Sequence, residues 1–173
     1  MLLKTDRFGE IRIAQEDIIH FPDGLLGFEE LHRYVVVERE RKGPIRFLQA
    51  VDDGRIAFAV TDPQTFRPDY LPELGEEDRA ALQYESDEDL AVLVILTVPQ
   101  EVREMTANLM APVIINVKER IGRQVVQGLG EYSTRHRIVD EMERSRRLIR
   151  AAGAHRLRTV SLEPTEDTLR QTV

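Results

Sequence analysis

Three aspartates that stand near one another in the sequence are the residues whose type and spacing most readily suggest catalysis. Asp52 and Asp53 are adjacent, and Asp62 follows nine positions after the second. Two carboxylates that lie close together can hold different pKa values and divide the general acid and base roles between them. However, the dipeptides Asp53-Gly54 and Asp62-Pro63 are also common turn signals. We therefore favour a structural role for these aspartates.

The other residues that could perform nucleophilic, metal or nucleotide chemistry are scattered. Cysteine is absent, and the histidines stand far apart, at His20, His32, His136 and His155. This spacing does not build a local metal site, and no serine lies in the G-x-S-x-G turn of hydrolases. Gly128-Leu129-Gly130 resembles the opening of a dinucleotide-binding turn, but Ser133 replaces its third glycine and no strand follows. The residues therefore indicate no catalytic triad, no metal site built from local ligands and no dinucleotide-binding turn.

Two asparagines interrupt the apolar run at residues 106–126. Asn108 and Asn116 stand on either side of Pro112, whose missing N–H suits the start of a strand or an edge position. A buried amide without partners costs about 1–3 kcal/mol, so we expect both asparagines to bond backbone groups at strand ends. For Asn108 an alternative stays open, in which it faces the backbone of a partner at an exposed sheet edge.

A loop with three prolines occupies residues 61–74, directly after the strand-like segment RIAFAVT. Its prolines at 63, 68 and 72 are too many for a helix or a central strand, so the segment is expected to lie over the sheet. Phe66, Tyr70 and Leu71 fit two roles. They are either apolar anchors of a binding surface or a cap on the core, and both interpretations remain open at this stage.

Most of the chain reads as short strands that recur every 8 to 14 residues with turn signals between them. IRFLQAV and RIAFAVT flank the Asp-Gly signal and predict a hairpin, whereas GEEDRAALQYE is the one helix-like piece of the body. This spacing is typical of antiparallel sandwiches and barrels. The predicted fold is mainly β: a single antiparallel domain, either a sandwich or a barrel, with one or two short helices and a basic helical C-terminal tail.

The charge of the chain is divided between an acidic body and a basic tail. The net charge of the whole chain is −7. Residues 135–158 hold eight arginines and three acids, a net charge of +5, and residues 159–173 have a net charge of −2. Residues 1–134 must therefore have a net charge of −10. We expect the acidic runs 76–78 and 85–89 to be solvated. The tail is expected to be helical to about residue 158 and disordered after it, and to dock on its own acidic body or on a neighbouring subunit.

Composition also limits location. Apolar runs reach about seven residues, the N-terminus lacks a signal-peptide pattern, and cysteine is absent, which together favour the reducing cytoplasm and exclude a membrane helix. Clustered arginines can follow a phosphate backbone, so a nucleic-acid-binding β-barrel that uses the tail is an alternative function. No aromatic residue is interleaved with those arginines for base stacking, which weakens that alternative.

An ordered set of short motifs resembles the family of the flagellar assembly factor FliW. No single motif is diagnostic, but their order is specific and spans residues 1–134, which defines a FliW-type domain followed by an extension at 135–173. The motifs are FPDGLLGFE at 21–29, FLQAVDD at 47–53, TDP at 61–63 with Phe66 and Asp69-Tyr70, TANL at 106–109, AP at 111–112, IIN at 114–116 and GRQ at 122–124. The extension is not covered by the resemblance, and its role is unassigned.

The resemblance implies a compact antiparallel β-barrel-like domain and a cytoplasmic regulator that is not an enzyme. Members of the family bind the translational repressor CsrA, an RNA-binding protein, and thereby relieve its repression of flagellin synthesis; they also bind flagellin, which competes for the factor. No cofactor, membrane or direct nucleic-acid partner is implied. An enzyme built on scattered carboxylates is the least favoured of three functional classes, after a protein-binding regulator and a nucleic-acid-binding β-barrel. The candidate partner contacts are Phe66, Tyr70, Leu71, Asn108, Leu109, Pro112 and Asn116.

Overall fold

Seven strands form a closed ring of hydrogen-bonded neighbours. A computed structural model gives the backbone of residues 1–39 and 43–160 and the side chains of residues 1–39 and 43–153. Within this part of the chain the ring runs β7–β6–β5–β4–β3–β10–β9 and returns to β7. Its strands are β3 (Ile19–His20), β4 (Arg33–Val37), β5 (Ile45–Ala50), β6 (Ala57–Thr61), β7 (Leu90–Thr97), β9 (Val113–Asn116) and β10 (Ile121–Gln124). The predicted β-barrel-like fold is confirmed.

One pairing in the ring is parallel. All other neighbours run antiparallel, as predicted, but β10 pairs with β3 in parallel through Ile121 and His20. A closed ring with an odd number of strands cannot alternate direction throughout, so at least one parallel contact is unavoidable. The seven-stranded ring places it where β3, the shortest strand of the ring, meets β10.

Alternate side chains of the strands fill the interior of the ring, where Tyr34, Leu48, Val60 and Ile115 are buried together. Burial raises the pKa of the Tyr34 phenol to about 12. β10 passes so close to this core that only a glycine fits at position 122. A Cβ at Gly122 would collide with the ring of Phe21, which is fully buried. The contact explains why the GRQ motif begins with glycine.

The three aspartates that could have been catalytic all accept hydrogen bonds from backbone N–H groups, at the start of β4 or in turns. The Asp52 carboxylate accepts hydrogen bonds from the backbone N–H groups of His32 and Arg33 at 3.0 and 2.9 Å. Asp53 and Asp62 each accept one from the N–H two residues further on, at 3.0 and 2.9 Å. The predicted structural role is confirmed, as is the hairpin of β5 and β6 around Asp53.

Three further groups of elements cover the outside of the barrel. The hairpin of β1 (Leu2–Thr5) and β2 (Gly9–Arg12) covers one apolar cluster, and α1 (Glu76–Ala81) lies beside a second. The third cluster lies under the proline-rich loop, β8 (Thr106–Ala107) and β11 (His136–Arg137). Short 3-10 turns complete the described fold at η1 (Gln15–Asp17), η2 (Pro63–Thr65), η3 (Asp87–Asp89) and η4 (Val102–Glu104).

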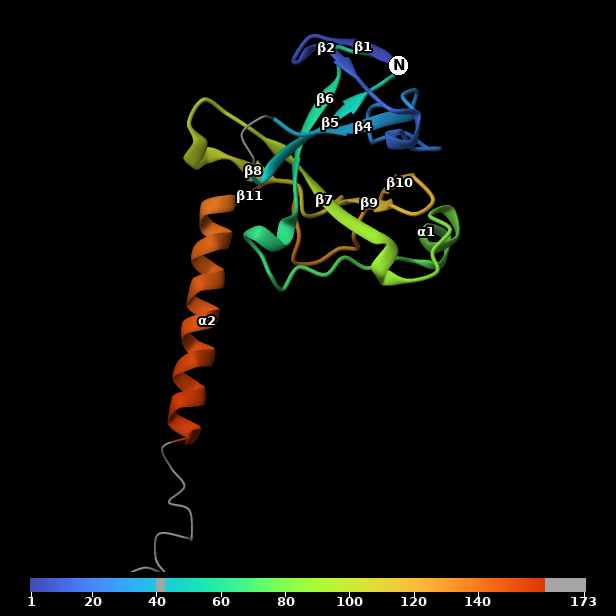
Figure 1. Ribbon diagram of the computed structural model, residues 1–173. Helices are drawn as coiled ribbons and strands as arrows, with labels where there is room; N and C mark the ends of the chain where they lie inside the picture. Colours follow the sequence, from blue (N-terminus) through green and yellow to red (C-terminus); the bar gives the residue numbers. More distant parts are fainter. Residues whose placement is uncertain (40–42, 161–173) are drawn as a thin grey trace, which may run out of the picture.

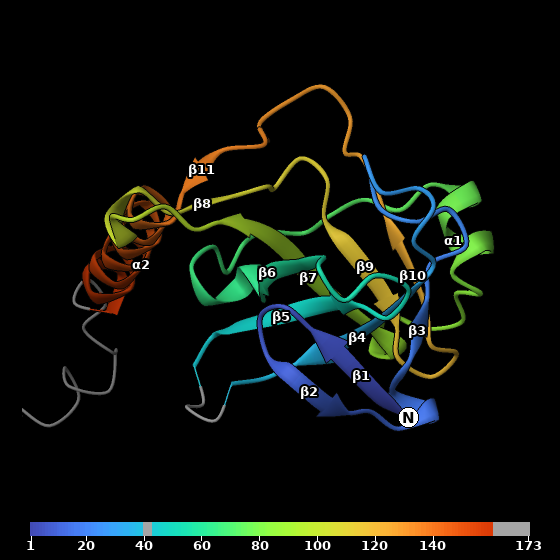
Figure 2. The ribbon, with the colours of Figure 1, turned by 90° about the horizontal axis from the view of Figure 1, so that it is seen from above.

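The predicted tail helix is confirmed as α2 (Ile138–Val160), a helix of 23 residues. Its first turns lie against the edge of the barrel formed by β8 and β11, and the rest projects away from the body as a rod (Figures 1 and 2). Neither helix of the described residues is long and apolar enough to cross a membrane. The predicted disorder after residue 159 concerns mainly residues 161–173, which lie outside the described part of the chain.

Candidate partner-binding site

Most of the residues that the sequence suggested as partner contacts lie inside the protein. Phe66, Tyr70, Leu109, Pro112 and Asn116 are all buried. The Tyr70 hydroxyl donates a hydrogen bond to the carbonyl oxygen of Leu109 at 2.7 Å, and burial raises the pKa of that phenol. In this conformation the five side chains support the barrel and its cover, and a partner does not reach them.

The two remaining candidates are accessible. The side chain of Leu71 is 79% exposed, and it lies at the rim of a pocket of about 370 Å³ between the proline-rich loop and the start of β7. Asn108 is half-buried. Contact of either residue with a partner stays a prediction, with Leu71 in the more open position.

Both asparagines bond backbone groups, as predicted. The Asn116 amide nitrogen donates to the carbonyl oxygens of Leu82 and Gln83 at 2.9 and 3.2 Å. Its oxygen accepts from two N–H groups of the turn after β9, both at 3.1 Å. The Asn108 oxygen accepts from the N–H of Ala111 at 3.0 Å. Asn116 therefore ties α1 to the end of β9, and Asn108 shapes the loop before it.

Residues of β5, β6 and the end of β7 line an apolar groove, together with Arg7 of the β1–β2 turn and residues between β4 and β5. Figure 2 shows β5 and β6 between the β1–β2 hairpin and β7. We call this apolar groove the Phe47 groove, after the ring at its floor. Its volume is about 860 Å³. Its walls are formed by Ile45, Ala57, Phe58, Ala59, Leu96 and Val98, with Gly43 and Pro44 at one end. Pockets of this size and composition are typical of binding sites.

Two arginines stand at the rim of the Phe47 groove. The guanidinium groups of Arg7 and Arg39 stack over the Phe47 ring, at 4.8 and 5.3 Å from its centroid. Both side chains are exposed, and neither forms an ion pair with another described residue. The groove therefore combines an apolar floor with two positive charges, although the body as a whole is acidic.

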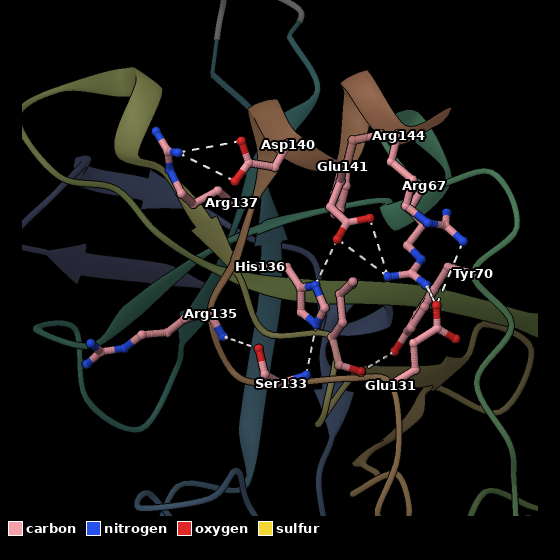
Figure 3. Close-up of polar contacts among 12 residues, drawn as sticks. Arg67, Tyr70, Glu131, Ser133, Arg135, His136, Arg137, Asp140, Glu141 and Arg144 are labelled. Atoms are coloured by element: carbon pink, nitrogen blue, oxygen red, sulfur yellow. Dashed lines mark hydrogen bonds and ion pairs between the residues drawn. The ribbon is translucent and has the colours of Figure 1, made fainter. Parts of the chain in front are cut away.

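A buried ionic cluster fixes the first turns of α2 to the body, with Arg67 at its centre (Figure 3). Arg67 lies in the proline-rich loop and is only 2% exposed. Its guanidinium forms ion pairs with Glu131 and with Glu141 of α2, the latter at 3.3 Å, and stacks over the ring of Tyr132 at 4.9 Å. The tail thus docks on the body partly through an acid of the tail and an arginine of the body, the reverse of the overall charge pattern.

His136 of β11 connects this cluster to the segment just before β11. The backbone N–H of Ser133 donates to its Nε2 at 2.8 Å, so Nε2 is the acceptor and the proton is on Nδ1. Nδ1 then donates to the Glu141 carboxylate at 2.8 Å. Glu141 is therefore held from two sides, by an imidazole and by the Arg67 guanidinium.

The next turn of α2 adds two more contacts with the proline-rich loop. Arg144 donates two hydrogen bonds to the Asp69 carboxylate, at 3.0 and 2.9 Å, which hold the pKa of Asp69 below its usual value. The Ser145 hydroxyl donates to the carbonyl oxygen of Phe66 at 3.0 Å. Residues 136–145 are consequently part of the packed body, although they lie beyond the predicted boundary at residue 134.

The acidic run at the start of α1 is exposed at Glu76 and Glu77, as predicted, whereas the Asp78 side chain is only 20% exposed. Arg123 of β10 forms ion pairs with Asp23, Glu77 and Asp78 at 2.7 to 2.9 Å. Burial lowers the pKa of Arg123, but hydrogen bonding to Glu77 and the charges of the two aspartates outweigh it and raise the pKa. The arginine of the GRQ motif thus neutralises part of the acidic surface, and Glu76 remains exposed.

Sequence reasoning missed Arg67 and the Phe47 groove. Arg67 sits before a proline in a polar loop, a context in which arginines are normally solvated, and its burial depends on α2 about 70 residues further on. A signal for the groove was present in β6, where Ala57 and Ala59 alternate with larger residues. Small side chains on one face of a strand leave room for a ligand or partner.

Comparison with known proteins gives a consistent result. The sequence profile of the family described as FliW protein matches residues 2–138. The chain is 43% identical over 145 residues to the flagellar assembly factor FliW of Alkaliphilus metalliredigens, covering 83% of this chain and 90% of that protein. It is 41% identical over 144 residues to the protein of the same name from Thermoanaerobacter pseudethanolicus, covering 83% and 96%. A crystal structure of the flagellar assembly factor FliW superposes with a TM-score of 0.76 at 35% identity, covering 80% of this chain and 96% of that one.

Proposed function

Because the chain belongs to the FliW family of flagellar assembly factors, we propose that it acts without catalysis, by binding flagellin and the translational repressor CsrA in turn in the cytoplasm. Binding of CsrA would release flagellin messages from repression, and accumulated flagellin would displace CsrA. The scattered histidines and serines and the turn-forming aspartates support a role in binding rather than catalysis.

The observation that supports this proposal most directly is the Phe47 groove. Apolar surfaces of this extent on a folded domain mark interaction sites, because they remain in water unless a partner covers them. The two arginines at the rim would pair with carboxylates of the bound segment, while Phe47 and the alanines of β6 accept its apolar side chains. The partner segment should therefore combine apolar and acidic residues.

Charge supports the antagonism of an RNA-binding protein. The body of residues 1–134 carries −10, so a repressor that binds it acquires a strongly negative neighbour. Such a neighbour repels the phosphate backbone over about 10 Å at 0.1 M salt, without occupying the RNA surface of the repressor. Release of RNA should then weaken as salt rises, and also when Glu76, an exposed acid outside the Arg123 cluster, is neutralised together with Glu77 and Asp78.

The test is calorimetric titration of the purified chain with flagellin and with CsrA from the same bacterium, followed by competition between the two. Val98→Glu places a charge in the Phe47 groove, and we expect it to weaken at least one partner about tenfold or more, or roughly 1.4 kcal/mol. Leu129→Glu is the matched control, since Leu129 is fully exposed and lies outside the groove.

The outcomes separate the function from its site. If the unchanged chain binds neither flagellin nor CsrA, the proposed function is wrong. If it binds both and Val98→Glu behaves like Leu129→Glu with each, the function stands but the groove is not where the partners bind.

A further inference from the structure

Helix α2 has an apolar row that the body does not cover. Val139, Met142 and Ile149 are 46%, 39% and 66% exposed and follow one another at intervals of three and seven residues. Arg146 and Gly153 occupy the positions that complete the row, which therefore has the alternating three-and-four spacing of a helix that packs along another helix. This row adjoins the side on which α2 docks through its buried glutamate and serine, and Ile149 lies at the border between the two.

The charges of α2 are divided along its length. Its first turns contain Asp140, Glu141 and Glu143, whereas residues 144–160 contain six arginines and no acid. Two such helices side by side in parallel would place like charges together and repel. In an antiparallel pair, the acidic turns of each helix lie beside the basic turns of the other, and every such contact occurs twice about a twofold axis.

The chain's own body cannot provide the missing partner for the second half of α2. Figures 1 and 2 show that the helix leaves the body after its first turns and projects away from it. Where it leaves, a cavity of about 230 Å³ between Pro68 and the side chains of Leu148, Ile149 and Ala152 shows that the apolar surface continues past the edge of the body. A projecting helix gains little stability by itself in water, so this surface requires a partner.

We propose that a second copy of this chain covers the apolar row, with the two α2 helices packed antiparallel and Glu143 of each beside Arg150 of the other. Glu143 and Arg150 are seven residues apart and so flank the row on the same side. Within its own helix Glu143 lies 3.8 Å from Arg147, and Arg150 has no ion pair among the described residues. Each copy thus offers the other the Arg150 guanidinium and an acid that is more than half exposed. Self-association would add a second interaction surface, remote from the Phe47 groove.

The test is sedimentation equilibrium of the full chain from about 1 to about 100 µM, a range that covers weak specific interfaces. We expect the mass to rise from 19.9 kDa towards twice that value with concentration, and the dimer to weaken as salt rises. Ile149→Glu, which places a charge in the row, should weaken the dimer at least tenfold.

Charge-swap variants test the arrangement of the two helices. Arg150→Glu and Glu143→Arg should each weaken the dimer several-fold, and the double variant should restore it, because both inter-chain pairs are then re-formed with reversed signs. Arg12→Glu on β2 is the control for the change in net charge and should leave the dimer intact. Circular dichroism of each variant checks that the helix is retained.

Three results would overturn the proposal. The unchanged chain could stay monomeric over the whole range, or the double variant could fail to restore association. Alternatively, a monomeric chain could bind single-stranded RNA and lose that binding on Arg150→Glu, which would assign the helix to a nucleic acid.

Discussion

Replacing Arg67 by methionine tests whether the buried ionic cluster holds α2 to the body. The change removes the guanidinium but keeps an apolar stem of similar length against Tyr132, so packing is largely preserved. The Glu141 side chain, 10% exposed, would be left buried with His136 as its remaining partner among the described residues. Removing one member of a buried ion pair costs about 3–5 kcal/mol.

The structure places the expected value at the lower end of that range. His136 continues to bond Glu141, while Glu131 and Asp69 are 64% and 50% exposed and can be hydrated when the guanidinium is gone. We expect a loss of about 3 kcal/mol in the free energy of unfolding. For a chain of this size that corresponds to a melting temperature lower by roughly 6–12 °C.

Urea unfolding and thermal melting followed by circular dichroism measure this loss, and amide hydrogen exchange of residues 138–145 shows whether α2 detaches first. The double variant Arg67→Met/Glu141→Leu removes both charges and should recover most of the stability, because no buried charge is then unpaired. The reasoning fails if the single variant stays within about 0.5 kcal/mol of the unchanged protein, or if the double variant is no more stable than the single one.

Three further predictions concern the barrel and the helix joint. Asn116→Ala removes the amide that bonds the carbonyl oxygens of the buried Leu82 and the exposed Gln83, and it should lower the free energy of unfolding by about 2 kcal/mol in urea, while a partner affinity that fell with no loss of stability would contradict this. Gly122→Ala forces a methyl group into the Phe21 ring and should cost about 1–3 kcal/mol in thermal melting, and an unchanged melting temperature would show that β10 can move aside. Because Arg144 holds the pKa of Asp69 below its usual 3.8, the stability from this pair is complete above that value and is lost as pH falls through the lower pKa of the folded state. Hydrogen exchange of residues 140–148 should report that loss, and Asp69→Asn should remove the contribution of this pair.

The sequence carried enough local information to predict the class of fold. Short β-branched segments, the Asp53-Gly54 signal and the prolines of residues 61–74 are local features, and each predicted the strand, hairpin or loop that the structure contains. The order of the strands was not predictable in this way, since β7 pairs with β6 before it and with both β8 and β9 after it. Such pairings depend on the closure of the whole ring.

The candidate site was predicted less well, for a physical reason. Aromatic residues in a proline-rich loop suit an interface and a core cover equally, and only burial separates the two: Phe66 and Tyr70 are covered by elements near the C-terminal end of the body. The groove, in contrast, is made by Phe47 and small residues of β6 that look like ordinary core. The alternation of small and larger residues in β6 is a local signal for the groove, but the same pattern also fits a buried strand and does not by itself indicate an open surface.

The parallel contact between β3 and β10 also sets the order in which the barrel can form. This contact, which we call the seam of the ring, joins His20 to Ile121, so about one hundred residues of chain separate its two sides. The hairpins β4–β5 and β5–β6 need only local contacts and can form early, whereas the seam must wait for the largest loop closure in the ring. During synthesis the barrel stays open until β10 has left the ribosome, so a nascent chain exposes its core side chains until the ring closes. With its short paired length, the seam is where we expect the folded barrel to open first.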